Sequence, residues 1–457
     1  MIEAGLNMAR LNFSHGTHEE HQLLLDNIRT TASKCQKVVA ILQDLQGPRI
    51  RVGDIGKKPR MLKNDEAVII TTGKVDARGL KIPITYDKLH QEAKAGHRIL
   101  MVDGLISLMV EKVTGRDLHC RVMSGGEINT HKGVNLPDTA VTIPALTAKD
   151  KEDLLFGVKN NVDYCALSFV RCAKDVIELR NLIHQYEKRL RVHAWRSIGI
   201  IVKIERKEAI DNLEEIIEAA DGVMVARGDL GIELPPEDVP LMQKMIIDRC
   251  LAKAKPVIVA TQMLDSMIVN PRPTRAEVSD VANAVIDHAD ALMLSGETAN
   301  GKYPVDSVAI MRRVIEKTES SAYDNLVVKN YTKKIEPTSE AIGRIANILA
   351  SSIKARAIIV SSLSGESGRI VSRYRPELPI FVACSELRVQ RQLQLSWGVR
   401  PFVMPLCDNV EELIEGAVDY LKKSKSIKAK DKVIIITGEP VGISGNVNLI
   451  EIKDIQK

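Results

Sequence analysis

Between Pro144 and Thr298 the sequence alternates short apolar segments with longer segments of helical pattern, and this alternation limits the possible folds most strongly. The apolar segments are nearly continuous runs of aliphatic residues, which is typical of strands buried on both faces of a parallel sheet. The pattern predicts repeated strand–helix units and a sheet covered by helices. The predicted strands are residues 164–170, 198–204, 222–226, 256–261 and 291–295.

Two further apolar runs, residues 8–13 and 38–44, bring the number of predicted strands to seven. A closed barrel of alternating strands and helices has eight. The chain begins at Met1 with a segment that resembles the last turns of a helix leading into the run at 8–13. We therefore expect an α/β protein with a TIM (β/α)8-type barrel whose first strand is missing.

The sequence pattern changes inside and after the predicted barrel. Residues 52–137 contain short strands, frequent glycines and tight turns, which predict a small β-barrel lid inserted into the barrel. A polar connector after residue 320 leads to a further alternation of helix and strand, which predicts an open α/β domain. A chain of 457 residues is long enough for about three domains. The predicted domains are the barrel at 1–51 and 138–325, the lid at 52–137 and a C-terminal domain at 335–457.

The composition excludes several classes of protein. The chain has 64 Lys+Arg and 59 Asp+Glu, a formal net charge of +5 and 45% hydrophobic residues, which is ordinary for a globular protein. Its longest apolar runs are far shorter than the roughly 18 residues of a membrane span, so we expect no membrane partner and a cytoplasmic location. Aromatic residues make up only 3% of the chain, too few for stacking platforms, so we expect no nucleic-acid partner.

Charged side chains follow two neighbouring strands at their carboxyl ends, where barrel enzymes place their active sites. The alternation of side chains along a strand turns Lys203 and Glu205 to one side and Ile204 to the other. Asp229 follows the next strand. Two carboxylates together with substrate oxygens are a usual way to hold Mg²⁺. For these residues taken alone, a simple Lys–Glu ion pair is an equally good interpretation.

Other strand ends offer groups that suit a phosphorylated substrate. Gly228 lets a backbone N–H approach an anion, and Thr261 and Ser295 bring hydroxyls, although each hydroxyl taken alone is better explained as a helix cap. At the first strand, Arg10 shares one face with an amide and a hydroxyl, a set that suits a phosphate and a cation. The other polar groups at or just after the ends of the runs 8–13 and 38–44 are Asn12, Ser14, Asp44, Arg49 and Arg51.

These residues together resemble the pyruvate kinase family, and the resemblance covers essentially the whole chain. It implies a barrel with an inserted lid, a C-terminal regulatory domain and a homotetramer. It also implies transfer of the phosphoryl group of phosphoenolpyruvate to ADP, with Mg²⁺ or Mn²⁺, to give pyruvate and ATP. The motifs that carry it are ARLNFSHG at 9–16, KGVNLP at 132–137, VKIE at 202–205, MVARGDLG at 224–231, ATQM at 260–263, PTRAE at 273–277 and MLSGET at 293–298.

The resemblance assigns roles residue by residue. It implies that Lys203 stabilises the transferred phosphoryl group and that Glu205 and Asp229 bind the divalent metal. Arg10 matches the position that holds the substrate phosphate. The substrate carboxylate is implied to bind at Gly228, Asp229 and Thr261, a proton relay at Thr261 and Ser295, and the nucleotide at Asn12, Arg51 and Lys132.

The predicted absence of the first strand leaves an alternative open. The chain could be a truncated, catalytically impaired homologue that acts as a regulatory or binding subunit. A lyase or mutase that uses phosphoenolpyruvate on a barrel is a second alternative, but such an enzyme needs neither the lid nor the loop at 361–368.

The monovalent-cation site that the resemblance implies is altered. Asn12, Ser14 and Asp44 match it, but Leu45 stands where a threonine usually provides an oxygen. Arg49 stands where a glutamate is common, and its guanidinium supplies the charge that K⁺ would bring. We therefore expect activity without added K⁺.

The loop at 361–368 resembles the family's phosphate-binding effector loop. In this resemblance Ser362, Ser364, Gly365 and Ser367 hold the phosphate of an activator. Glu366 places a negative charge inside the loop, which weakens binding of a bisphosphate. We expect another phosphorylated metabolite as effector, or none.

Overall fold

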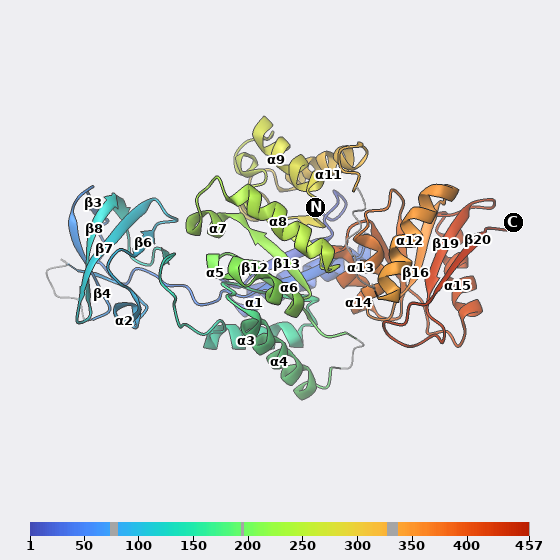
Figure 1. Cartoon of the computed structure of the whole chain (residues 1–457), viewed down its shortest axis with the longest axis horizontal. Coiled ribbons are helices and arrows are strands. Elements are labelled where there is room, and N and C mark those ends of the chain that lie inside the picture. The colour runs from blue at the N-terminus through green and yellow to red at the C-terminus, as the bar shows by residue number, and fades with distance from the viewer. Residues whose placement is uncertain (74–80, 193–195, 327–336, 457) are drawn as a thin grey trace.

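The computed structural model describes residues 1–73, 81–192, 196–326 and 337–456, and its central unit is a parallel sheet of seven strands (Figure 1). The strands lie in chain order and every neighbouring pair is parallel, so each connection returns the chain beside the strand that it left. The predicted α/β class is therefore confirmed. The strands are β1 (Met8–Asn12), β2 (Ala40–Asp44), β11 (Tyr164–Leu167), β12 (Gly199–Ile204), β13 (Gly222–Ala226), β14 (Val257–Ala260) and β15 (Ala291–Leu292).

Within the described residues, β1 and β15 are the two edges of this sheet. An eighth strand between them would close a barrel, and this agrees with the prediction of seven strands. The strands are shorter than predicted at some carboxyl ends, most clearly at β15, which was expected to reach Ser295. The Ser295 N–H instead donates to the Glu297 carboxylate at 2.7 Å, so it leaves the ladder.

Helices follow the strands and cover the outside of the sheet (Figure 1). Three of them begin with a reciprocal capping box, including the predicted one at Thr274 and Glu277. Within the described residues, no helix combines the length and the apolar character that a bilayer span requires. The helices of this unit are α1 (His18–Lys34), α3 (Ala148–Lys159), α4 (Ala173–Arg189), α5 (Lys207–Asp211), α6 (Leu213–Ala219), α7 (Arg227–Glu233), α8 (Val239–Ala252), η1 (Asp265–Ile268), α9 (Arg275–Ile286), α10 (Gly296–Ala299) and α11 (Pro304–Glu319).

The alternation along β12 decides which of its side chains enter the interior of the curled sheet. Ile200, Val202 and Ile204 belong to the core between the sheet and the helices. Ile201 points the other way and packs with interior residues of the neighbouring strands. Since Lys203 lies two positions after Ile201, it is turned to the same interior face.

The inserted lid forms a separate body at one end of the molecule (Figure 1). It has its own apolar core, built from residues between 50 and 141. The chain enters and leaves the lid side by side, because Arg51 and Gly133 form an antiparallel bridge. Its elements are β3 (Arg60–Leu62), β4 (Ala67–Thr71), β5 (Lys81–Pro83), α2 (Leu89–Glu92), β6 (Arg98–Met101), β7 (Ile106–Thr114), β8 (Asp117–Ser124), β9 (Gly126–Ile128) and β10 (Val134–Asn135).

The C-terminal unit is an open sheet with the strand order β18-β17-β16-β19-β20, in which the last strand is antiparallel. The order reverses at β16, so the loop after β16 begins at the topological switch point, where open α/β sheets bind ligands. The elements are α12 (Thr338–Ile353), β16 (Ala357–Ser361), α13 (Glu366–Ser372), β17 (Ile380–Cys384), α14 (Leu387–Gln392), η2 (Leu393–Leu395), β18 (Val399–Val403), α15 (Val410–Lys423), β19 (Lys432–Thr437) and β20 (Leu449–Asp454).

The predicted domain limits stay proposals. The sheets lie within the predicted domains, and the limits at 51/52, 137/138 and 325 fall in connecting segments between elements. The predicted start of the C-terminal domain at residue 335 and its last residue, 457, lie outside the described residues.

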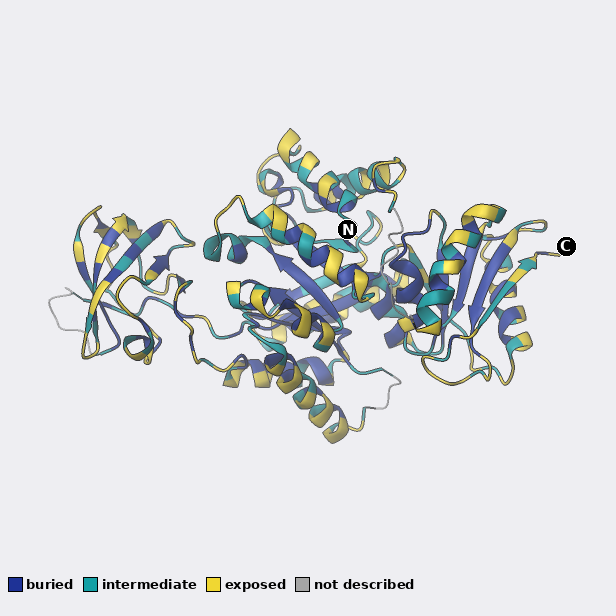
Figure 2. Cartoon of the chain, viewed as in Figure 1, coloured by how far each residue is buried: buried dark blue, intermediate teal, exposed yellow. Residues whose placement is uncertain are grey.

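The C-terminal unit packs against the end of the sheet where the strands begin. Leu395 of η2 is 1% exposed and joins the apolar cluster of the sheet interior. The Tyr164 hydroxyl donates to the Gln392 carbonyl at 2.8 Å, and the Gln392 amide donates to the carbonyls of Asp163 and Ser197, both at 2.9 Å. Most of α13 is buried at this interface, as its dark blue ribbon in Figure 2 shows, whereas α14 is only partly buried.

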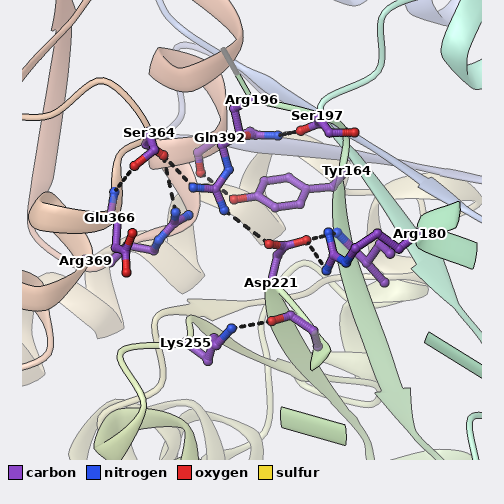
Figure 3. Close-up of polar contacts among 12 residues, drawn as sticks. Tyr164, Arg180, Arg196, Ser197, Asp221, Lys255, Ser364, Glu366, Arg369 and Gln392 are labelled. Atoms are coloured by element: carbon purple, nitrogen blue, oxygen red, sulfur yellow. Dashed lines mark hydrogen bonds and ion pairs between the residues drawn. The ribbon is translucent and has the colours of Figure 1, made fainter. Parts of the chain in front are cut away.

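Asp221, directly before β13, is the central carboxylate of this interface (Figure 3). It pairs with Arg180 at 2.9 Å and with Arg196 at 3.3 Å, and Arg196 also donates to the carbonyl of Ser364 in the C-terminal unit. Burial alone would raise the pKa of Asp221, but the two guanidinium groups outweigh burial and hold that pKa below its usual value.

We predict that Asp221→Asn lowers the midpoint of thermal unfolding by about 3–6 °C at pH 7, because two guanidinium groups then face a neutral amide. The pKa of the native carboxyl is depressed, so its contribution is present above the unfolded pKa of about 4 and is lost as the pH falls through the native value. The difference between wild type and variant should therefore shrink below about pH 4. Scanning calorimetry across this pH range measures it.

Asp211→Asn is the matched control, because Asp211 pairs with Lys207 on an exposed helix face and its side chain is 61% exposed. It should leave the midpoint within about 1 °C of wild type. An Asp221→Asn effect that is as large at pH 3 as at pH 7 would contradict the proposed ionic origin.

Candidate active site

Lys203 occupies the centre of the carboxyl end of the sheet. Its side chain is 9% exposed, and its ammonium lies 2.7 Å from Glu205 Oε1 and 3.7 Å from Asp44 Oδ1. It donates a hydrogen bond to Ser168 Oγ at 2.9 Å. Burial tends to lower the pKa of Lys203, but Asp44 and Glu205 outweigh burial and raise it above its usual value. The ammonium is therefore a fixed positive charge in the interior of the sheet.

The carboxylate of Glu205 is held on one side and open on the other. Its Oε2 accepts the N–H of Phe169 at 2.7 Å, and Phe169 adopts a φ of +56°, which is uncommon for a residue with a side chain. Its Oε1 is buried and has no hydrogen bond of acceptable geometry within the described residues, although it is an ion-pair partner of Lys203. Asp44 Oδ1 is in the same situation. Both oxygens therefore face the ammonium of Lys203, which lies closer to Glu205 Oε1 than to Asp44 Oδ1.

The charges at this end of the sheet sum to a net negative value. Asp44, Glu205 and Asp229 outnumber Lys203 and Arg10, and the carboxylates Asp44 and Glu205 raise the pKa of Lys203 against the effect of burial. For Glu205 the main cause of the raised pKa is burial, and the charge of Asp229 adds to it. Such an excess favours uptake of a cation.

A divalent metal fits this excess. Within the described residues, no three His, Cys, Asp or Glu side chains are gathered in metal-binding geometry, so the chain offers no complete protein cage. Glu205 and Asp229 with substrate oxygens form the partial set that Mg²⁺ commonly uses.

Arg10 links the first strand to this group of charges. It donates to Asp44 Oδ2 at 2.6 Å, and its side chain is 24% exposed, so the guanidinium also faces the open end of the sheet. Asn12 is the register partner of Asp44, and Asn12 Oδ1 accepts the N–H of Ser14 at 3.2 Å. The structure therefore brings the predicted monovalent-cation residues together on adjoining strands.

The two altered positions of that cation site differ in environment. Leu45 is 1% exposed and belongs to the apolar core. Arg49 is exposed on the segment that leads to the lid. Leu45 therefore contributes only its backbone carbonyl, which accepts the Ser168 hydroxyl at 2.9 Å.

Gly228 and Thr261 come together at the ends of β13 and β14. The Gly228 N–H donates to Thr261 Oγ1 at 2.9 Å. Thr261 has a φ of +72°, a strained conformation of the kind that is concentrated at functional sites. Asp229 lies in the first turn of α7, directly after Gly228. This corner therefore has a backbone N–H, a hydroxyl and a carboxylate.

Ser295, Arg51 and Lys132 are the remaining predicted site residues, and they lie on other segments than the charged groups around Lys203. Ser295 is half-buried after β15, with its N–H bound to Glu297. Arg51 and Lys132 lie together at the base of the lid, where Arg51 donates to the His131 carbonyl at 3.1 Å. Neither has a hydrogen bond or ion pair to the barrel charges within the described contacts.

The four predicted residues of the effector loop lie in two different environments. Ser362 and Ser367 line a cavity of about 580 Å³, whereas Ser364 and Gly365 do not. Gly365 has a φ of +80° and precedes α13, so its lack of a side chain is needed there. Glu366 is exposed in the first turn of α13 and is not part of the cavity lining.

The sequence analysis missed three residues that position this site. Arg227 makes a two-pronged ion pair with Asp280 at 2.7 Å and donates to the Thr261 carbonyl at 2.8 Å, so it holds the strained turn. Glu297 accepts N–H groups of Leu264 and Ser295, and Ser168 accepts from Lys203. Ser168 lies within the strand predicted at 164–170 and directly follows β11, and Arg227 directly precedes Gly228, so both lie near the strand ends to which the argument applies.

Comparisons with known proteins match nearly the whole chain to pyruvate kinases. The family model "Pyruvate kinase, barrel domain" matches residues 1–308, and "Pyruvate kinase, alpha/beta domain" matches residues 340–453. A pyruvate kinase of Geobacillus stearothermophilus is 44% identical over 99% of this chain and 76% of that protein. One of Clostridium acetobutylicum is 40% identical over 100% of this chain and 95% of that protein. A solved pyruvate kinase of Cryptosporidium parvum is 36% identical, with a TM-score of 0.91 over 99% of this chain and 92% of that one.

The barrel sheet, the lid and the charged strand ends are those of a phosphotransferase built on an α/β barrel. The chain belongs to the pyruvate kinase family. The predicted resemblance is confirmed, and these comparisons give no support to the alternative of an impaired homologue.

Proposed function

We propose that the chain transfers the phosphoryl group of phosphoenolpyruvate to ADP, giving pyruvate and ATP, with Mg²⁺ or Mn²⁺ held by Glu205 and Asp229. The observation that supports it best is the buried ammonium of Lys203, which lies 2.7 Å from Glu205 Oε1 and 3.7 Å from Asp44 Oδ1. Loose phosphoryl transition states need positioning and positive charge rather than covalent help. Lys203 provides that charge in a site from which water is largely excluded.

The other residues act on the two ends of the substrate. Arg10, which faces the open end of the sheet, holds the phosphate by a charge-assisted fork. The Gly228 N–H and the Thr261 hydroxyl, now bound to each other, exchange that bond for the substrate carboxylate. Glu205 and Asp229 would hold the metal, which would supply Lewis-acid chemistry when bound. A water ordered by Thr261 Oγ1 and Ser295 Oγ delivers the proton to the methylene carbon of the enolate.

The nucleotide binds between the lid and the barrel in this proposal. Arg51 and Lys132 lie together at the base of the lid, and Asn12 lies at the end of β1. The lid is joined to the barrel by two adjacent chain segments, which suits a hinge. The homotetramer is a proposal that rests on the family alone, and the cytoplasmic location is a proposal that rests on the family and on the sequence.

We predict that Lys203→Met lowers kcat about 10²–10³-fold, because it removes the charge nearest to the transferred group. Coupling pyruvate formation to lactate dehydrogenase, at saturating phosphoenolpyruvate and ADP, measures kcat. Lys207→Met is the matched control, since Lys207 is exposed and pairs only with Asp211 among the described residues. If a folded Lys203→Met chain, checked by circular dichroism, keeps kcat within threefold of wild type, the proposed role of Lys203 is wrong.

We predict full activity without K⁺. Arg49 carries its own charge on the segment next to Asp44, and Leu45 offers no side-chain oxygen. Activity assayed with tetramethylammonium salts should change less than twofold when K⁺ is added, and Arg49→Glu should create a requirement for K⁺. Strict dependence of the wild-type chain on K⁺ would refute this.

We predict weak activation by fructose 1,6-bisphosphate, because Glu366 adds a negative charge to the first turn of α13 beside the loop. Titration up to about 100 μM should raise the activity at subsaturating phosphoenolpyruvate less than twofold, and Glu366→Gln should increase the response. A strong activation of the wild type in the micromolar range would contradict this prediction.

A further inference from the structure

A second, smaller cavity lies between the barrel and the C-terminal unit, and its lining residue Arg369 also donates to the Ser364 carbonyl of the effector loop at 3.4 Å. It shares no lining residue with the cavity at Ser362 and Ser367. We name it the interdomain cavity. The polar residues that line it are Lys255, Asp290, Arg369, Ser372, Arg373, Arg375 and Ser396.

The interdomain cavity has more cations than carboxylates. Arg375 pairs with Asp290 at 3.0 Å, and Arg373 pairs with Glu340 at 2.9 Å. Within the described residues, Lys255 and Arg369 have no ion-pair partner. Asp221 lies nearby but is already shared by Arg180 and Arg196, as Figure 3 shows. Two positive charges at this interface therefore lack a negative partner of their own.

Three donor groups on the lining are also buried without a partner. Within the described residues, Arg369 Nη1, Arg375 Nε and Ser396 Oγ accept or donate no hydrogen bond. These side chains belong to residues that are 8%, 5% and 6% exposed. Buried donors of this kind are costly unless a partner satisfies them, so their grouping on one cavity indicates an absent acceptor.

The pKa values of Arg369 and Lys255 are both shifted downward, which agrees with their burial at this cavity. Burial lowers the pKa of Arg369 to about 10, and the charge of Arg196 adds to the effect. Burial also lowers the pKa of Lys255. In both cases burial outweighs the attraction of nearby carboxylates such as Asp221, and a bound anion would oppose the shift.

The donor set favours an oxyanion over a water molecule. A water can accept two hydrogen bonds but neutralises no charge, whereas the oxygens of phosphate accept several bonds from guanidinium, ammonium and hydroxyl groups. The donor set of the interdomain cavity therefore suits an oxyanion.

We propose that the interdomain cavity binds an inorganic oxyanion of the phosphate class, which joins Lys255 of the barrel to Arg369, Arg375 and Ser396 of the C-terminal unit. Such a ligand would hold the barrel and the C-terminal unit together, because its oxygens would accept hydrogen bonds from donors of both units. The proposal does not depend on the catalytic function.

Isothermal titration calorimetry of the full chain with inorganic phosphate, at constant ionic strength set by chloride, tests this proposal. We expect Lys255→Met to remove one class of phosphate sites or to weaken it at least tenfold. Ser396→Ala keeps every charge and should weaken the same class about threefold or more. Lys253→Met is the control, since Lys253 is exposed, pairs with Glu218 and does not line the cavity.

Two results would overturn the proposal. One is phosphate binding that is the same in the wild type, Lys255→Met and Ser396→Ala. The other is a crystal structure, grown in phosphate, that shows only an ordered water among Lys255, Arg369 and Ser396. Phosphate can also bind at the catalytic residues and at the effector loop, but neither of those sites includes Lys255. Loss of phosphate binding in Lys255→Met therefore identifies the interdomain cavity as the site.

Discussion

The ammonium of Lys203, enclosed by Asp44 and Glu205, is the interaction on which the architecture of the catalytic end depends. A buried ammonium is stable only when its partners are fixed in place, and several backbone features fix them. The N–H of Phe169, in a left-handed conformation, holds one oxygen of Glu205, and Ser168 accepts from the ammonium while it donates to the Leu45 carbonyl. The strain at this strand end is therefore explained by the charge that it positions.

The same sheet also connects the catalytic end to the C-terminal unit. β13 begins after Asp221, which binds Arg196 and through it the Ser364 carbonyl of the effector loop. It ends at Ala226, next to the clamp that Arg227 makes on the Thr261 turn. A strand of five residues spans roughly 17 Å, so about one strand length separates Asp221 from the Thr261 turn. β13 therefore connects the contacts of the C-terminal unit to the carboxyl end of the sheet.

Much of the fold followed from local patterns. Apolar runs and their spacing predicted all seven barrel strands, and the alternation around Ile204 predicted that Lys203 and Glu205 share a face. The strand ends were less predictable. β11 stops at Leu167 because the N–H of Phe169 leaves the ladder for Glu205, a residue 36 positions away. No pattern within a strand contains that partner.

The interface and the clamp escaped prediction for the same reason. Arg227 finds Asp280 across 53 positions, and Gln392 reaches Asp163 across 229. The sequence shows these groups only as polar residues on helices and loops, for which a solvated position is the ordinary expectation. The buried cations of the interdomain cavity belong to this class, because their burial is caused by the docking of one unit on another.

The side-by-side entry and exit of the lid affects the order in which the chain can fold. β2 pairs directly with β11, and the Ile41 N–H reaches the Asp163 carboxylate, although 122 positions separate these two residues. During synthesis the ribosome must complete the whole lid before β11 emerges, and the lid has its own core. The nascent lid can therefore fold before β11 is available to pair with β2. The bridge at the base of the folded lid then holds the two barrel segments close together, so that β11 can add to the sheet beside β2.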